Sequence, residues 1–208
     1  MTEDEARHWL IANHDVSRET LAKLDSYAVA VAAEQRSQNL VSAATLSNFW
    51  SRHIVDSAQL LRLGGAGSWL DIGSGAGLPG LVIAVLTHGD VLLVEPRPLR
   101  ANFLVRLVQA LDLPRCRVAA TPIARVDTET FAVITARAVA PLPKLVAMAG
   151  RFADLSTIWV LPKGRSAQSE LASLPTAWQG HWSAVPSVTD PSSRILIGRG
   201  IRGDHQLS

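Results

Sequence analysis

The sequence is poor in cysteine and has no long apolar run. Cys116 is the one cysteine among 208 residues, which excludes a disulfide framework and an all-cysteine metal site and leaves a reduced thiol on a predicted strand. The apolar run over residues 81–86 spans six positions, whereas a membrane-crossing helix needs about 20 residues. We therefore expect no transmembrane segment and no bound metal.

The first residues also lack the pattern of a secretory signal. They include the acidic residues Glu3, Asp4 and Glu5, whereas a signal peptide starts with basic residues and continues with an apolar stretch. We therefore expect a cytoplasmic protein. The length and the hydrophobic fraction of 48% suit one domain with a sizeable core and a small helical appendage.

Net charge is low but unevenly distributed. The net charge is +2, yet residues 1–60 carry five Lys or Arg against eight Asp or Glu, while residues 97–208 carry fourteen against seven. Arginine supplies 17 of the 20 bases, and its planar fork of donors suits phosphates and base edges. This favours a nucleic-acid partner, although a genome-wide preference for arginine explains the same count equally well.

Hydrophobic spacing divides the chain into a helical cap, residues 1–63, and an alternating core, residues 64–208. Thr2 and Glu5 have the form of a capping box before the first helix. In the core, short apolar runs alternate with helical patterns, which indicates an α/β fold with a mostly parallel sheet covered on both faces. The predicted helices span 3–13, 18–36, 45–63, 79–87, 99–111 and 143–152, and the predicted strands span 69–72, 91–95, 117–120, 131–136, 157–161, 182–188 and 194–198.

The strongest motif is the glycine-rich segment 71–80, between a predicted strand and a predicted helix. Residues 75–80 spell the dinucleotide fingerprint G-x-G-x-x-G. The first glycine after the strand is Gly73, however, and the sixth position counted from it is Leu78 instead of glycine. The form Asp-x-Gly-x-Gly-x-Gly, starting at Asp71, is similar to the cofactor loop of S-adenosylmethionine-dependent methyltransferases.

Two carboxylates accompany this loop. Asp71 would meet the cationic amino-acid end of the cofactor, or else it caps the loop structurally. Glu95 ends the second predicted strand and would accept hydrogen bonds from both ribose hydroxyls, as acids at this position do in nucleotide-binding folds. The alternative for Glu95 is a solvated charge at a strand end.

The residues after the predicted strand 131–136 indicate the methyl acceptor. The segment 135–142 lacks the Asn/Asp-Pro-Pro-aromatic pattern of adenine N6 methylation, and Cys116 is poorly placed as the nucleophile of pyrimidine C5 methylation. Arg137 leaves an otherwise mostly apolar strand. Guanine N7 already carries a lone pair, so it needs orientation, which an arginine at guanine O6 or at a phosphate provides.

Taken together, the chain resembles the bacterial guanine-N7 methyltransferases of small-subunit ribosomal RNA, the RsmG or glucose-inhibited division protein B family. The resemblance implies a Rossmann-like class I S-adenosyl-L-methionine-dependent methyltransferase, with a seven-stranded mostly parallel sheet and an N-terminal helical cap. It also implies 16S ribosomal RNA or a small-subunit assembly intermediate as partner, and we expect a monomer. The matching segments are 39–40, 53–57, 71–80, 137–142, 162–164 and 194–197.

The resemblance assigns roles to individual residues. Arg137 and Lys163 are the expected catalytic residues, and His53, Lys163 and Arg194 are expected to face the RNA. His53 is equally well a satisfied helix histidine beside Asp56, and Arg194 equally well starts the last strand. The expected cofactor-binding residues are Asp71, Gly73, Gly75, Leu78, Glu95, Pro122, Ile123 and Arg137.

The chain departs from the family pattern at two places. The acidic stretch that follows the third strand in the family is replaced by residues 121–124, so Pro122 and Ile123 would contact the adenine ring through packing and backbone groups, with Asp127 as a substitute acid. A family lysine in the helix after Glu95 appears as Leu99, with Arg100 beside it. Two other functions stay open: an NAD-dependent oxidoreductase built on residues 75–80, and a non-catalytic ribosome assembly factor with a degenerate pocket.

Overall fold

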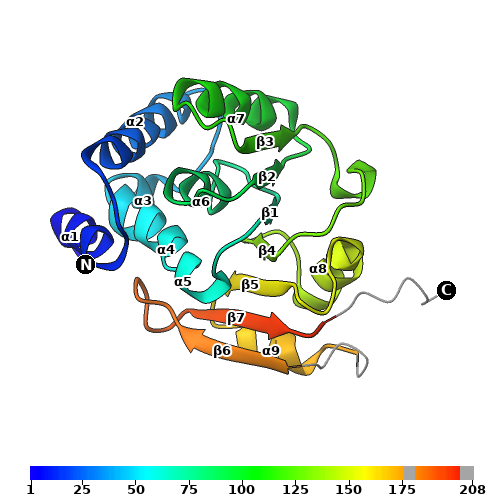
Figure 1. Cartoon of the computed structure of the whole chain (residues 1–208). Helices are drawn as coiled ribbons and strands as arrows, with labels where there is room; N and C mark the ends of the chain where they lie inside the picture. Colours follow the sequence, from blue (N-terminus) through cyan, green and yellow to red (C-terminus); the bar gives the residue numbers. More distant parts are fainter. Residues whose placement is uncertain (176–180, 202–208) are drawn as a thin grey trace.

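The core of the protein is one seven-stranded sheet. A computed structural model describes residues 1–175 and 181–201 (Figure 1), and the strand order is β3-β2-β1-β4-β5-β7-β6. The first five strands pair in parallel, whereas β7 runs antiparallel to both β5 and β6. The predicted mostly parallel sheet is therefore confirmed. Its strands are β1 (Trp69–Ile72), β2 (Val91–Val94), β3 (Cys116–Ala119), β4 (Val133–Ala136), β5 (Ile158–Lys163), β6 (His181–Pro186) and β7 (Arg194–Arg199).

The central strands are short and apolar because they are covered on both faces. Every residue of β1, β2 and β4 is buried, as expected for parallel strands between two helical layers. Alternate side chains enter different apolar clusters: Trp69 and Leu93 belong to one, Leu70 and Ile72 to the other. Cys116 begins β3 as a buried free thiol, as predicted.

Helices cover both faces of the sheet. Figure 1 shows α2, α4 and α6 on one face and α8 on the other. The capping box predicted at Thr2 and Glu5 is present at the start of the first helix. The helices are α1 (Glu3–Asn13), α2 (Arg18–Glu34), α3 (Ala43–Leu46), α4 (Val55–Ala58), α5 (Leu61–Gly64), α6 (Gly80–Leu86), α7 (Pro98–Ala110), α8 (Leu142–Ala149) and α9 (Ala167–Ala172), with a π-helical turn at Trp50–Ile54 and 3-10 turns at Ile123–Arg125 and Gly150–Phe152.

The prediction of one regular helix over residues 45–63 was wrong. The segment is broken into α3, the π-helical turn, α4 and α5. The carboxylate of Glu3 accepts hydrogen bonds from the backbone N–H groups of Trp50 and Ser51, each at 3.0 Å. These donors are thereby satisfied from outside the segment, so the helical hydrogen-bond ladder restarts at Trp50. The contact joins residues far apart in sequence, which periodicity does not detect.

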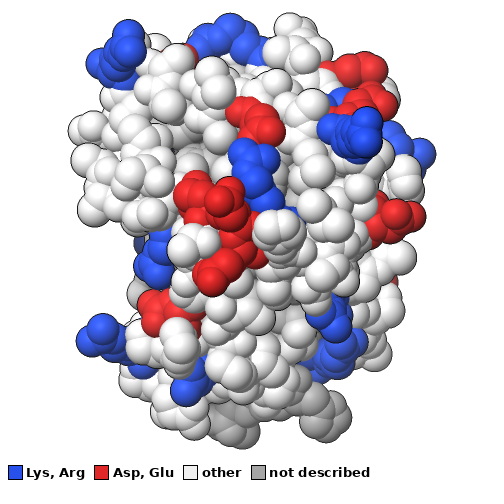
Figure 2. Space-filling model, turned by 90° about the vertical axis from the view of Figure 1, so that its left-hand side faces the viewer, with Lys and Arg blue, Asp and Glu red and all other residues white. Residues whose placement is uncertain are grey.

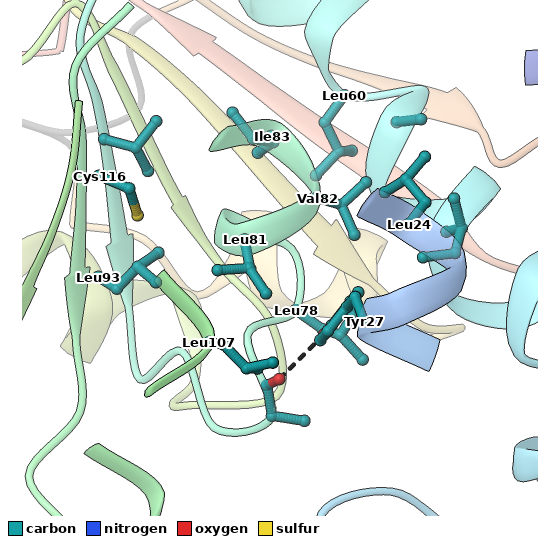
Figure 3. Close-up of a cluster of buried hydrophobic side chains, with 14 of the residues drawn as sticks. Leu24, Tyr27, Leu60, Leu78, Leu81, Val82, Ile83, Leu93, Leu107 and Cys116 are labelled. Carbon is teal, nitrogen blue, oxygen red and sulfur yellow. Dashed lines mark hydrogen bonds between the residues drawn. The ribbon is translucent and has the colours of Figure 1, made fainter. Parts of the chain in front are cut away.

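The residues of the predicted cap share an apolar cluster with those of the predicted core. Leu24 and Tyr27 of α2 pack in the same cluster as Leu81 of α6 and Leu107 of α7 (Figure 3). The buried Tyr27 hydroxyl donates a 2.9 Å hydrogen bond to the carbonyl of Ala76, within the glycine-rich segment. Helix α2 therefore supports that segment directly. The boundary at residue 64 stays a prediction.

The surface over the N-terminal helices carries charges of both signs. Figure 2 shows acidic and basic side chains lying next to one another on this face instead of one patch of a single sign. Among the residues that the structure describes, no helix is long and apolar enough to cross a membrane.

Candidate active site

Two cavities meet at the segment that follows β4. Cavity A has a volume of about 340 Å³ and cavity B a volume of about 540 Å³, both within the usual size range of ligand pockets. Arg137, Ala138 and Val139 line both cavities. Cavity A is otherwise lined by Leu40, Gly73, Ser74, Gly75, Ala76, Leu78, Glu95, Pro96, Arg97 and Arg100.

Cavity B is enclosed by segments from both halves of the sequence. Its lining brings together four of the residues singled out from the sequence, namely His53, Arg137, Lys163 and Arg194. The rest of its lining is Thr45, Arg52, Asp56, Ala138, Val139, Ala140, Pro141, Pro162, Gly164, Ser166, Glu170, Ser187, Thr189, Asp190, Ser193 and Ile195.

The glycine-rich segment forms one wall of cavity A because β1 ends at Ile72 and the chain turns sharply there. Gly73 has a φ of +70°, and a Cβ atom added to it would lie 2.6 Å from the Cγ2 atom of Val139. Only glycine combines this backbone conformation with so close an approach. The N–H groups of Gly73 and Ser74 both donate to the carbonyl of Val94, at 2.8 and 3.1 Å, which fixes the wall against β2.

Glu95 is the anchored carboxylate of cavity A. It follows β2 and is 3% exposed. Its Oε2 atom accepts from the N–H of Gly75 and its Oε1 atom from the N–H of Arg97, both at 2.9 Å. Each carboxylate oxygen has a second lone pair, so Glu95 holds the glycine-rich segment and still has acceptor capacity toward a ligand hydroxyl.

Asp71 lies outside the lining of both cavities. Its side chain is fully buried, and its Oδ2 atom accepts from the N–H of Gly80 at 3.0 Å. Its Oδ1 atom has no hydrogen-bond partner among the described residues. Burial raises the pKa of Asp71 to about 6. Asp71 therefore has the loop-capping role, because its hydrogen bond to Gly80 joins β1 to the start of α6.

Asp71→Asn is expected to remove a pH dependence of stability. Because the pKa of Asp71 rises from 3.8 to about 6 on folding, the folded protein binds the proton more tightly, so this group lowers stability as pH increases from about 4 to about 6. The loss is about 3 kcal/mol. In urea unfolding at several pH values, the free energy of the variant minus that of the wild type should rise by this amount. If the unfolding free energies of the variant and the wild type changed in parallel with pH, the prediction would be contradicted. Asp127→Asn, at an exposed residue, serves as control.

The guanidinium of Arg137 contacts residues of the π-helical turn and of α4. Its side chain is 24% exposed, and its Nη1 atom lies 3.5 Å from Asp56 Oδ2 and 3.4 Å from His53 Nδ1. Asp56 is itself fixed, because its Oδ1 atom accepts a 2.7 Å hydrogen bond from the Thr189 hydroxyl. The side chain that follows β4 is thus positioned by His53 and Asp56, and through Asp56 by the loop before β7.

His53 is neutral at physiological pH. Burial, followed by the charges of Arg137 and Arg52, lowers the pKa of His53 to about 4. Its Nε2 atom lies 3.0 Å from the Thr45 hydroxyl, so a proton on Nε2 leaves Nδ1 as an acceptor for Arg137. His53 is therefore a hydrogen-bonded helix histidine that also lines cavity B. The two interpretations of this residue from the sequence are compatible.

Lys163 and Arg194 are adjacent partners where β5 pairs with β7. The ammonium of Lys163 lies 2.8 Å from Glu170 Oε2 and donates to the carbonyl of Ala140 at 2.9 Å. Arg194 starts β7, and its Nη1 atom donates to the carbonyls of Pro191 and Ser193 at 2.6 and 3.1 Å. Both basic side chains therefore have protein partners as well as a place in cavity B.

The structure does not bring the predicted adenine contacts into cavity A. Pro122 is exposed, Ile123 packs against the apolar cluster that contains Phe152, and neither lines the cavity. Asp127 is also exposed and outside the lining. Arg100 does line cavity A and donates to the carbonyl of Asn39 at 2.9 Å, whereas Leu99 is 68% exposed.

Sequence reasoning missed several cavity residues. Leu40 and Val139 lie within segments whose pattern had been noted, 39–40 and 137–142, yet their side chains were not singled out. Glu170 and Thr189 had no signal, since each lies in a polar stretch without a recognisable motif. The helix α9, which carries Glu170, was not predicted, because its six residues are too few for a clear hydrophobic period.

The strand order, with a glycine-rich turn after β1 and an acid after β2, defines the class I S-adenosylmethionine-dependent methyltransferase fold. A solved C-terminal domain of precorrin-6Y C5,15-methyltransferase from Rhodobacter capsulatus superposes with a TM-score of 0.51 at 21% identity, over 70% of this chain and 88% of that one. A mutant of MtNAS in complex with S-adenosylmethionine superposes with a TM-score of 0.57 at 16% identity, over 85% of this chain and 71% of that one.

Sequence comparison defines the family more narrowly. A family model described as rRNA small subunit methyltransferase G matches residues 20–196. The "Ribosomal RNA small subunit methyltransferase G" of Sphingopyxis alaskensis is 46% identical over 198 residues, which cover 94% of this chain and 85% of that protein. The chain belongs to the rRNA small subunit methyltransferase G family, as its motifs had indicated.

Proposed function

We propose that the protein transfers a methyl group from S-adenosyl-L-methionine to N7 of a guanine in 16S ribosomal RNA. The observation that carries this proposal is the position of Arg137, which lines both the cavity beside the glycine-rich segment and the cavity beside His53, Lys163 and Arg194. One side chain thereby touches both a cofactor site and an acceptor site, as direct transfer between two bound molecules requires.

The residues of cavity A fit the cofactor. Gly73 and Gly75 leave backbone exposed at its wall, Leu78 adds an apolar contact, and Glu95 retains acceptor capacity for ribose hydroxyls. When bound, S-adenosyl-L-methionine supplies an electrophilic methyl group on a sulfonium. Since Pro122 and Ile123 lie outside the lining, other apolar side chains of the cavity, such as Leu40 and Pro96, offer a surface to the adenine.

Cavity B suits a base that needs no deprotonation. The N7 lone pair of guanine forms the new N–C bond while the S–C bond breaks, and the positive charge moves from sulfur to the base, so no proton has to be removed. Arg137 keeps donors free after its contacts with Asp56 and His53, because a guanidinium has five N–H groups. A donor directed at guanine O6 orients the base and leaves N7 open. Lys163 and Arg194 add positive charge for the RNA backbone.

The RNA substrate has to present an unstacked guanine. Enzymes that modify a base inside structured nucleic acid take it out of the stack, so 16S ribosomal RNA within a small-subunit assembly intermediate is the proposed partner of a cytoplasmic monomer. Neither alternative from the sequence is favoured. The glycine register and the family argue against an NAD-dependent oxidoreductase, and the anchored Glu95 argues against a degenerate pocket.

Transfer of labelled methyl groups tests this function. Small ribosomal subunits and their intermediates, prepared from cells that lack the gene, are incubated with the protein and methyl-labelled S-adenosyl-L-methionine. We expect one N7-methylguanine per RNA molecule by nucleoside mass spectrometry, with short naked RNA a poorer acceptor. Absence of transfer despite intact RNA binding, or methylation at another atom, would overturn the proposal. Calorimetry with NADH in place of S-adenosyl-L-methionine tests the oxidoreductase alternative.

A further inference from the structure

A mostly buried ion pair lines cavity B close to the segment that the two cavities share. Lys163 is the last residue of β5 and Glu170 lies in α9, and their charged atoms are 2.8 Å apart. The side chains are only 10% and 18% exposed. Because removing charges from water is costly, such a pair persists only when further hydrogen bonds satisfy it.

Those further bonds converge on the segment after β4. Glu170 Oε2 accepts from the N–H of Leu142 at 2.8 Å, and Glu170 Oε1 accepts from the Ser166 hydroxyl at 2.8 Å. The ammonium of Lys163 donates to the carbonyl of Ala140 at 2.9 Å. Burial by itself raises the pKa of Glu170, yet the bonds from Lys163, Ser166 and Leu142 hold that pKa below its usual value. The ion pair therefore forms hydrogen bonds with the backbone of both residue 140 and residue 142.

The segment 137–142, to which the ion pair is bonded, contains a strained backbone conformation. Ala138 has a φ of +57°, a left-handed conformation that non-glycine residues adopt only when the surrounding structure imposes it. Ala138 and Val139 are exposed in the cavities, and Val139 packs directly against Gly73 of the cavity A wall. The same segment starts with Arg137. Any relaxation of it would move the guanidinium and the wall between the two cavities.

We propose that Glu170 is a positioning residue for methyl transfer. Through Lys163 and the N–H of Leu142 it holds residues 137–142 in their strained path and so fixes Arg137 between the cavities. It also orients the Lys163 ammonium, which has three N–H donors; two of them are taken by Glu170 and Ala140, and one stays available to a group bound in cavity B. This inference rests on the proposed function and adds a residue that acts through Lys163 and the segment 137–142.

Three variants test it by a double-mutant cycle: Glu170→Gln, Lys163→Met and the two combined. A misplaced Arg137 is expected to lower kcat by about tenfold to a hundredfold, with a much smaller change in the KM for RNA. Because both residues support the same segment through a shared contact, the effects of the single variants on kcat should be less than additive in the double variant. Glu129→Gln removes an exposed ion pair with Arg117 and is the matched control, with kcat unchanged.

Amide hydrogen exchange separates this inference from the proposed function. The N–H of Leu142 should exchange faster in Glu170→Gln than in the wild type, whether or not the RNA is a substrate. If Glu170→Gln does not fold, Ser166→Ala, which removes one bond to Glu170, should show the same change to a smaller degree. Unchanged Leu142 exchange, additive effects of the single variants on kcat, or a Glu170→Gln kcat equal to that of the wild type would overturn the inference. Inactivity of the wild type itself would instead overturn the function.

Discussion

Arg137→Ala is expected to lower kcat for methyl transfer at least a hundredfold while the protein stays folded. Three residues line both cavities, and truncation removes the charged side chain among them. Loss of a group that orients the acceptor lowers the rate by about two orders of magnitude or more. Burial of the apolar cores is unaffected, because Arg137 belongs to neither cluster. The measurement is single-turnover transfer of labelled methyl groups, together with a thermal unfolding curve.

Two controls sharpen this prediction. Arg125→Ala changes an exposed arginine outside both cavities and should keep the wild-type rate. Because the charge of Arg137 is one of the causes that lower the pKa of His53, this pKa should increase in Arg137→Ala, as measured by NMR titration of the imidazole. Undiminished turnover would remove Arg137 from the active site, and an unchanged His53 pKa would contradict the contact between them.

Glu95→Ala should weaken binding of S-adenosyl-L-methionine by about a hundredfold or more. Hydrogen bonds to a charged group are worth about 1.5–3 kcal/mol each, and the variant loses the bonds expected from the ribose. It also leaves the N–H groups of Gly75 and Arg97 without their present partner, so the glycine-rich segment loses its bond at Gly75, although Gly73 and Ser74 still donate to Val94.

Isothermal titration calorimetry measures this effect. Glu95→Gln keeps one acceptor oxygen but places an amide donor opposite a backbone donor, so its loss of affinity should be intermediate, about tenfold. Glu129→Ala is the control for removal of an exposed carboxylate outside the lining of cavity A. A wild-type affinity in Glu95→Ala would show that the acid after β2 is only a support for the loop.

Much of the fold follows from local pattern. The central strands were predicted because continuous apolar runs bounded by glycine and proline are typical of strands buried on both faces. Short stretches of sequence likewise predict the helix cap at Thr2 and the end of the helical region at residues 64–67. The segment 45–63 was predicted incorrectly because the carboxylate of Glu3, more than forty positions away, interrupts its helical ladder.

The site divides in the same way. The sequence by itself determined the glycine-rich turn, the acid at residue 95 and the arginine after β4, because each lies at the end of a predicted strand or directly after it. Only the tertiary structure decided that Asp71 is sealed beneath the loop, that His53 and Asp56 hold Arg137, and that Glu170 braces the wall between the cavities. The physical reason is that burial and hydrogen-bond partnership depend on elements that meet only when the sheet is assembled, whereas backbone turns and strand ends depend on their immediate neighbours.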